Sequence, residues 1–267
     1  MESSKRFLDL LERHSRGWRF WLGWLLGLAI ALGVHGRSVG LPPDVLAQLP
    51  APQVHPLPQN LVTTPPVEAA DYFDAVSPSP LGYLVWSNFP VRVYFSPTDP
   101  TASIATQKRQ QQWQRAVTEA IAQWQAYLPL TTTETPETAD IIIRRQAPPA
   151  QKQIHPETGE TRYFFGRNAI TDYEFYVDAE NILRHRMTIL LSDHQGAIAT
   201  QNTARHELGH ALGIWGHSPN IADALFASQV GTHGEITVAD INTLRKIYQQ
   251  PTRVGWPMPP DISAQNP

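Results

Sequence analysis

The stretch "HELGHALGIWGHS", residues 206–218, is the feature that most constrains how this chain can fold. His206 and His210 are four residues apart, so in a helix they lie one above the other on the same face and can bind one metal ion from one side. Gly213 falls where such a helix would end, because glycine can adopt a positive φ and turn the chain back. A third histidine, His217, follows within reach. The stretch therefore predicts a helix, a glycine turn and a loop that returns to a metal ion.

Glu207 supplies the group that hydrolytic chemistry at such a metal requires. It follows His206 and precedes His210 by three residues, so its carboxylate leans toward the same edge of the helix without being a ligand. Zinc lowers the pKa of a bound water to about 7, and a carboxylate can take the proton as the water attacks a carbonyl and then return it to the leaving amine. His-Glu-x-x-His alone also arises by chance on solvated helix faces, whereas the glycine and third histidine make this pattern far more specific.

The motif and the segments around it resemble the metzincin zinc peptidases, and within them the matrixin-like branch, whose signature is His-Glu-x-x-His-x-x-Gly-x-x-His. The segment "HELGHALG" matches that signature, and over residues 81–250 "WSNFPVRVYF", a long helix, "ADIII" and "ADINTLRKIY" occur in the family order. The resemblance implies an α+β fold, a metzincin-like catalytic domain with a twisted mixed β-sheet, a long packing helix, an active-site helix and a C-terminal helix. It also implies that His206, His210 and His217 bind Zn²⁺ and that Glu207 is the catalytic general base. The substrate would be a peptide or protein lying extended along an edge strand, as in β-augmentation.

The sequence departs from that signature at two positions. One additional residue precedes His217, so Gly216 occupies the family's ligand position and offers no side chain. Because a Zn–N bond of about 2.0–2.1 Å tolerates little error, we expect conformations open only to glycine at this position to return His217 to the metal. Asp223 and His233 are the alternative third ligands. Where the family places a methionine beneath the zinc, this chain has Leu225, which is equally apolar and close in volume.

Hydrophobic periodicity predicts the elements that carry this site. Alternation in "WSNFPVRVYF" predicts a strand, and "ADIIIRR", "DYEFYV" and "HRMTILLS" are strand-like in composition, with "DYEFYV" as the candidate edge strand. Thr237 followed by Asp240 resembles a capping box, and Pro251 ends the C-terminal helix that they begin. An apolar stripe at intervals of three and four residues predicts a long packing helix, formed by Trp113, Ala116, Val117, Ala120, Ile121 and Trp124.

Residues 1–36 have the pattern of a signal-anchor or a signal peptide. A basic stretch precedes the apolar run "FWLGWLLGLAIALGV" at residues 20–34 and little positive charge follows it, which favours a remainder outside the cytoplasm. The run is short for a spanning helix, which usually needs about 20 residues, and only weak small-residue cleavage patterns lie at its end. We therefore expect a membrane-anchored protein with an extracytoplasmic catalytic domain, or a secreted one if the segment is cleaved. A buried soluble helix would leave the charge asymmetry unexplained.

The remaining boundaries follow from proline content and periodicity. Residues 37–80 are crowded with proline, which predicts an extended linker before the zinc peptidase domain at 81–251. The alternative is an inhibitory pro-segment, which without cysteine could not silence a zinc ion through a thiolate. Residues 252–267 show no periodicity and are expected to form a flexible C-terminal tail.

Composition excludes several functions. The chain has no cysteine, hence no disulfide and no cysteine-liganded metal, and its net charge of −3 gives no reason to expect nucleic acid as a partner. The main alternative to an enzyme is a catalytically inactive pseudoenzyme of the same fold, or a zinc-containing binding module at the membrane surface. Four other histidines have no partner at ligand spacing and are expected to be surface or satisfied polar residues: His155, His185, His194 and His233.

Overall fold

The computed structural model describes residues 48–64, 70–149, 151–154, 161–164, 167–227 and 234–259. Its centre is a five-stranded sheet with the order β2-β1-β3-β7-β6. The strands are β1 (Val91–Phe95), β2 (Leu130–Thr132), β3 (Ile141–Arg145), β6 (Ala169–Val177) and β7 (Leu183–Leu191). The first four in this order run parallel, and β6 is antiparallel to β7. The predicted strand "DYEFYV" therefore lies in β6, at an edge of the sheet. A separate antiparallel hairpin pairs β4 (Gln151–Ile154) with β5 (Thr161–Phe164).

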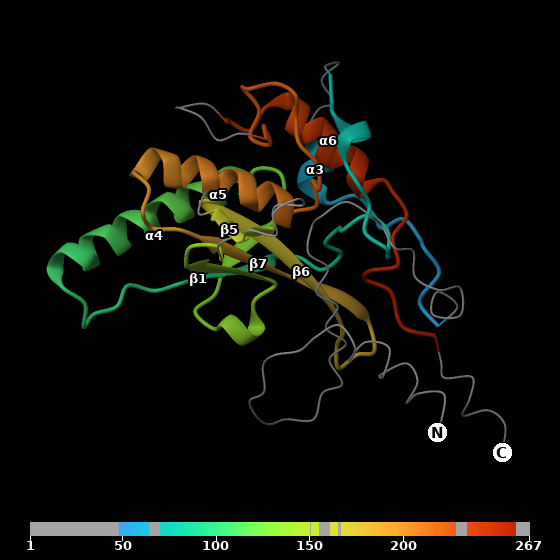
Figure 1. The fold of residues 1–267 in the computed structure, drawn as a ribbon. Coiled ribbons are helices and arrows are strands. Elements are labelled where there is room, and N and C mark those ends of the chain that lie inside the picture. Colours follow the sequence, from blue (N-terminus) through green and yellow to red (C-terminus); the bar gives the residue numbers. More distant parts are fainter. Residues whose placement is uncertain are drawn as a thin grey trace.

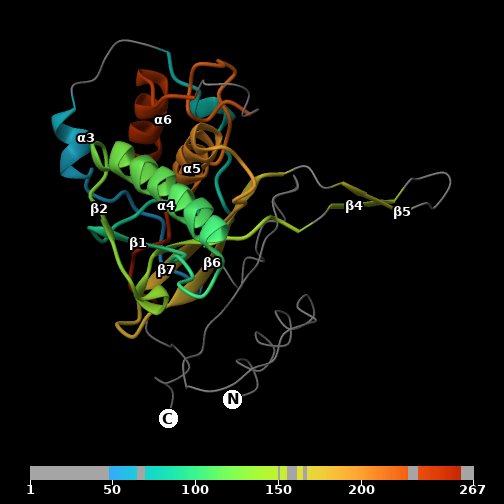
Figure 2. The same cartoon turned by 90° about the vertical axis from the view of Figure 1, so that its left-hand side faces the viewer.

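Two helices, α4 (Ile104–Gln125) and α5 (Ala197–Ala211), lie side by side on one face of the sheet, as Figures 1 and 2 show from two directions. Beyond α5 lies α6 (Val238–Tyr248), and the short α3 (Gln59–Thr63) lies beside it. Two short 3₁₀ turns, η1 (Phe73–Ala75) and η2 (Pro136–Thr138), complete the described elements. The mixed sheet with its covering helices confirms the predicted α+β fold.

The hydrophobic patterns account for these layers. Alternate residues of β7 are buried, so one face of that strand packs under the helices. Every residue of the stripe predicted for the long helix is buried in α4. Trp124 of that stripe also donates a hydrogen bond from its Nε1 to the carbonyl oxygen of Arg205 at 2.9 Å. The packing helix therefore holds α5 in place by both apolar contact and a directed hydrogen bond.

The C-terminal helix begins as the sequence predicts. Thr237 and Asp240 form a capping box at the start of α6, and the helix ends at Tyr248, before Pro251. The Asp240 side chain is fully buried, and burial raises the pKa of its carboxyl group. Its oxygens accept hydrogen bonds from the amides of Thr237 and Ala224, at 2.8 and 3.0 Å. A residue of the predicted capping box thus also fixes the loop that precedes the helix.

The proline-rich segment packs differently from the extended linker that was predicted for residues 37–80. Within residues 48–64 and 70–80 several apolar side chains are buried in the same core as the sheet and helices, namely Leu49, Leu61, Tyr72 and Val76. Arg245 of α6 donates a hydrogen bond to the Leu61 carbonyl oxygen at 3.2 Å. Proline limits regular structure here to the short α3 and η1, but it leaves the apolar side chains between the prolines able to enter the core. Residues 48–64 and 70–80 therefore pack as part of the domain.

The C-terminal segment differs from the expected flexible tail over residues 252–259. Its Thr252 and Val254 are buried, and the Gln53 amide donates to the Thr252 carbonyl oxygen at 3.0 Å. Trp256 stacks on His55 with ring centroids 4.1 Å apart. Absence of periodicity excluded a long helix or strand but did not exclude packing of an irregular segment.

Helices able to cross a bilayer are not found within the described ranges, because none there is both long and apolar enough. The apolar run predicted at residues 20–34 lies outside those ranges, as do His155, His233 and residues 260–267.

Candidate metal centre

Helix α5 carries the two histidines of the motif and ends where the glycine predicts. Gly213 has a φ of 125°, in the range that favours glycine, and a Cβ atom there would lie 2.5 Å from the Leu84 carbonyl oxygen. The last carbonyl groups of the helix are satisfied by buried side chains. Trp86 Nε1 donates to Ala211 O at 3.0 Å, and the Tyr248 hydroxyl donates to Leu212 O at 3.1 Å. The turn is therefore fixed in both backbone conformation and position.

Three histidines come together at this turn. One ring nitrogen from each of His206, His210 and His217 lies within 4.8 Å of the others. His206 is buried, His210 is partly buried and His217 is exposed, so the cluster opens toward solvent on one side. An open side is what distinguishes a catalytic metal site from a closed structural one.

The hydrogen bonds of the two helical histidines fit a bound cation. His206 Nδ1 lies 2.8 Å from the Ala224 carbonyl oxygen, and His210 Nδ1 lies 2.7 Å from that of Ile214. Because a carbonyl oxygen only accepts, each Nδ1 carries the proton and each neutral ring presents a lone pair on Nε2. The two Nε2 atoms are 3.0 Å apart, where lone pairs repel unless a cation lies between them. Two nitrogens bound to tetrahedral zinc are about 3.3 Å apart, close to this separation.

The protonation of the cluster also suits a metal. Burial lowers the pKa of His206 well below its usual range, and the neighbouring His210 lowers it further. Burial likewise lowers the pKa of His210. Desolvation, with a contribution from His210, lowers the pKa of His217 to about 4. All three imidazoles are therefore neutral at pH 7, the form that binds a divalent cation.

Glu207 lies on the same helix and is buried. Its Oε2 accepts a hydrogen bond from the Thr171 hydroxyl of β6 at 2.5 Å. Burial raises the pKa of the Glu207 carboxyl to about 7, although the Thr171 hydrogen bond opposes the shift. The carboxylate is thus held between the helix and the edge strand, with a proton affinity near that needed to exchange protons at neutral pH. Sequence reasoning did not find Thr171, since a threonine in a strand carries no distinguishing pattern.

Leu225, the residue expected to form an apolar floor, packs against the helix that carries two of the histidines. It is fully buried, and a Cβ atom on Gly209 would lie 2.5 Å from its Cδ2 atom, so the helix sits directly on this side chain. Its amide donates to Asp240 Oδ1 at 3.4 Å, and the preceding carbonyl, of Ala224, is the partner of His206. The loop therefore supports the helix through Leu225 and orients a histidine through its neighbour.

Replacing Leu225 by alanine is expected to destabilise the domain by about 2–5 kcal/mol, the usual cost of a cavity of this size, whereas Leu225→Met should cost less than about 1.5 kcal/mol. The free energy of unfolding from urea titration checks both values. Ile221→Ala serves as the control, because Ile221 lies in the same loop but is 46% exposed. Equal stability of Leu225→Ala and the unchanged protein would contradict the proposed floor.

The extra residue before His217 is accommodated differently from the expectation. Gly216 does not have a positive φ, so a glycine-only backbone conformation is not what permits the loop. Instead, a Cβ atom there would overlap the Ala75 carbonyl oxygen and lie 2.9 Å from the Val76 Cα atom. Glycine is required because another segment of backbone passes against it. This contact joins segments far apart in the chain, and the glycine is the only feature of the local sequence that indicates it.

The described alternatives to these ligands lie elsewhere. Asp223, considered as a third ligand, is buried and accepts hydrogen bonds from Ser218 at 2.5 Å and Thr237 at 2.7 Å. His185 is buried against Trp86, with ring centroids 3.9 Å apart, and His194 is exposed. None of them joins the histidine cluster within the described residues.

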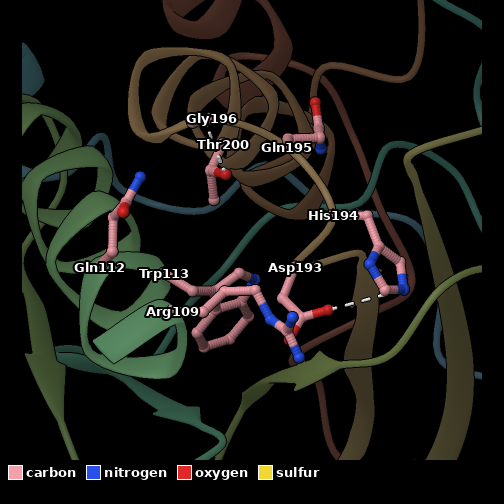
Figure 3. Close-up of a pocket in the computed structure, with 8 residues that line it drawn as sticks. All are labelled: Arg109, Gln112, Trp113, Asp193, His194, Gln195, Gly196 and Thr200. Atoms are coloured by element: carbon pink, nitrogen blue, oxygen red, sulfur yellow. Dashed lines mark hydrogen bonds and ion pairs between the residues drawn. The ribbon is translucent and has the colours of Figure 1, made fainter. Parts of the chain in front are cut away.

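A hollow lies at the end of α5 opposite to the histidine cluster, between that helix and α4 (Figure 3). Its volume is about 380 Å³. Arg109 and Asp193 form an ion pair of 3.2 Å at its wall, and Gly196 marks the start of α5. Ten residues of helix separate Gly196 from His206, a distance of about 15 Å at 1.5 Å per residue. The hollow is therefore separate from the histidine cluster.

Comparison with models of protein families matches residues 95–249 to the matrixin family. That range covers more than half of the chain and includes β2, β3, β6 and β7 of the sheet, both large helices and the histidine cluster. Comparison with individual curated proteins gives no match.

Proposed function

Because the chain belongs to the matrixin family, we propose that it is a zinc endopeptidase that hydrolyses peptide bonds. The observation that carries this proposal is the convergence of His206, His210 and His217 within 4.8 Å, on and behind a helix that also bears Glu207. The absence of cysteine leaves histidine and carboxylate as the strong metal donors of this chain, and three neutral imidazoles with an open side suit zinc. The proposed ligands are thus the three histidines.

The proposed chemistry assigns the proton transfers to Glu207. When bound, zinc would lower the pKa of a water molecule and polarise the carbonyl of the substrate. Glu207 would take the proton of the attacking water and deliver it to the leaving amine. Thr171 would hold the carboxylate in place through the 2.5 Å hydrogen bond to Oε2. The pKa of about 7 for the Glu207 carboxyl supports this role, because a group that takes and returns a proton works best near the ambient pH.

The proposed substrate is an extended polypeptide beside β6. An edge strand offers unpaired backbone donors and acceptors, which an extended chain can pair by β-augmentation. Tyr173 of β6 contacts Trp215 at 4.9 Å between ring centroids, and Trp215 lies 5.9 Å from His210. These aromatic rings connect the edge strand with the histidine cluster and would contact an apolar side chain of the substrate.

A mixed peptide library tests the proposal. The purified protein is expected to bind one zinc ion and to cleave library members, and a chelator should stop cleavage until zinc is restored. Zinc binding without cleavage of any member would favour the inactive pseudoenzyme or the zinc-containing binding module. Failure to bind zinc, even after reconstitution, would exclude both the peptidase and the metal-containing module.

We further propose that the N-terminal segment carries the domain out of the cytoplasm and anchors it to the membrane, or is cleaved to release it. The support is the basic stretch followed by the apolar run at residues 20–34. A reporter that functions only outside the cytoplasm, fused after residue 47, should be active. Activity of a cytoplasmic reporter alone would contradict this localisation, and a mature N-terminus near Arg37 would replace the anchor with a cleaved signal.

A further inference from the structure

A short segment that precedes β1 in the chain contacts the loop that carries the third histidine. We name residues 72–77 the strap. The Ser77 amide donates a hydrogen bond to the Trp215 carbonyl oxygen at 3.0 Å. One residue further along the loop, a Cβ atom on Gly216 would lie 2.8 Å from the carbonyl carbon of Ala75. The strap thus touches the two residues that immediately precede His217, and both contacts are between backbones.

The strap is anchored to α6 at its other end. The Tyr72 hydroxyl donates to Asp240 Oδ1 at 2.5 Å, and the Tyr72 amide donates to Thr243 Oγ1 at 3.0 Å. Tyr72 and Val76 are both buried. The preceding Asp71 pairs with Lys246 of α6 at 2.7 Å. The strap is therefore fixed by α6, whose Asp240 also holds the loop around Leu225.

The other side of the histidine is held by the loop around Leu225. The Ser218 amide donates to the Leu225 carbonyl oxygen at 2.9 Å, and the Ser218 hydroxyl donates to Asp223 Oδ2 at 2.5 Å. Residues 216 and 218 are therefore both fixed, one by the strap and one by this loop. His217 lies between them and is exposed, so its ring depends on these neighbours for its position.

We infer that the strap positions His217 for the metal and thereby accommodates the additional residue between Gly213 and His217, an inference that rests on the proposed role of His217 as a zinc ligand. A loop with one residue more has more conformations available, and contacts at Trp215 and Gly216 remove that freedom. The strap lies outside residues 95–249, the range that matches the family. The support for the third ligand thus comes from a part of the chain beyond the matched domain.

The first test removes the hydrogen bond from the Ser77 amide of the strap to the Trp215 carbonyl oxygen of the loop. In the full chain, Ser77→Pro deletes the amide donor, while Ser77→Ala keeps it and removes only an exposed hydroxyl. Ser77 precedes Pro78, which favours extended backbone at this position, and the ring of a proline at position 77 would also press against the Trp215 carbonyl oxygen that accepted the hydrogen bond. Zinc affinity, measured by competition with a chromogenic chelator, should fall roughly 10- to 100-fold in Ser77→Pro, the usual effect of losing support around a ligand. Ser77→Ala should bind zinc as the unchanged protein does.

The second test introduces a methyl group where strap and loop meet. Gly216→Ala should displace the loop from the strap, whereas the control Gly196→Ala places its Cβ where no atom lies within 4 Å. Cobalt(II), which absorbs visible light according to its coordination, replaces zinc as the probe. The Gly216→Ala spectrum should shift toward that of His217→Ala, and the Gly196→Ala spectrum should match the unchanged protein.

A double-mutant comparison separates positioning from general stability. If the strap acts through His217, Ser77→Pro should have no further effect on zinc affinity once His217 is alanine. An equal loss in both backgrounds would overturn the inference, because it would show a structural effect on the whole site. Unchanged zinc affinity in Ser77→Pro and an unchanged cobalt spectrum in Gly216→Ala would overturn it as well. If the unchanged protein binds zinc, either result leaves the proposed function standing, whereas failure of the unchanged protein to bind zinc would refute that function itself.

Discussion

Replacing His217 by alanine is expected to weaken zinc binding at least about 100-fold and to abolish peptide hydrolysis, a larger loss than that typical of residues that merely support a ligand. The physical reason is that His206 and His210 bind from one side, along one helix face, and cannot enclose an ion alone. Chelator competition measures the affinity, and cleavage of a fluorogenic peptide from the library measures activity. Both measurements should change together.

His194→Ala is the matched control for this variant, since it removes the same kind of side chain from an exposed position about one helix length away. It should leave zinc affinity and cleavage unchanged. If His217→Ala kept full zinc and full activity, the third ligand would lie elsewhere. Asp223 would then have to leave its hydrogen bonds to Ser218 and Thr237, or His233 would have to supply the donor.

Replacing Glu207 by glutamine should leave zinc bound but lower the rate of hydrolysis at least about 100-fold, the scale expected for loss of a general base. The amide keeps the size of the side chain and an oxygen that can accept the Thr171 hydrogen bond, but it cannot take a proton. Zinc content from elemental analysis and turnover of the same peptide distinguish the two effects.

Thr171→Val provides the comparison for the glutamate variant. It removes the hydroxyl that holds the carboxylate but leaves the base itself, so its rate should fall less than that of Glu207→Gln. Turnover of Glu207→Gln at the unchanged rate would assign the proton transfers to another group. Loss of zinc in that variant would instead show that the carboxylate supports the metal site.

Elements with strong local periodicity were predictable from the sequence. The six buried residues of the α4 stripe and the Thr237–Asp240 cap are local patterns, so each could be recognised within its own segment. The packing of residues 48–64, 70–80 and 252–259 was not predicted, because these segments have no hydrophobic period. Their burial depends on long-range partners, such as the stacking of Trp256 on His55.

The same distinction between local patterns and long-range contacts applies to the candidate site. His206, Glu207 and His210 follow from helical spacing, and the turn follows from Gly213, whose positive φ the structure shows. The supports of these side chains did not follow, because they are backbone atoms of distant segments, such as the carbonyl of Ala224 and the amide of Ser77. A backbone carbonyl or amide is present at almost every position, so the residue type does not reveal which of them supports a side chain.

The pairing of Gln53 with Thr252 has a consequence for when the enzyme can form. These residues, and His55 with Val254 next to them, are about two hundred positions apart, which is a large separation for contacts that complete a core. Contacts between residues so far apart in the sequence form late in folding, because the conformational entropy of the chain between them must be lost first. A chain still being synthesised lacks the second partner of each pair, so these contacts form only when the last of these residues has left the ribosome. A peptidase assembled in this order would reach its finished form only after residues 252–254 have been synthesised.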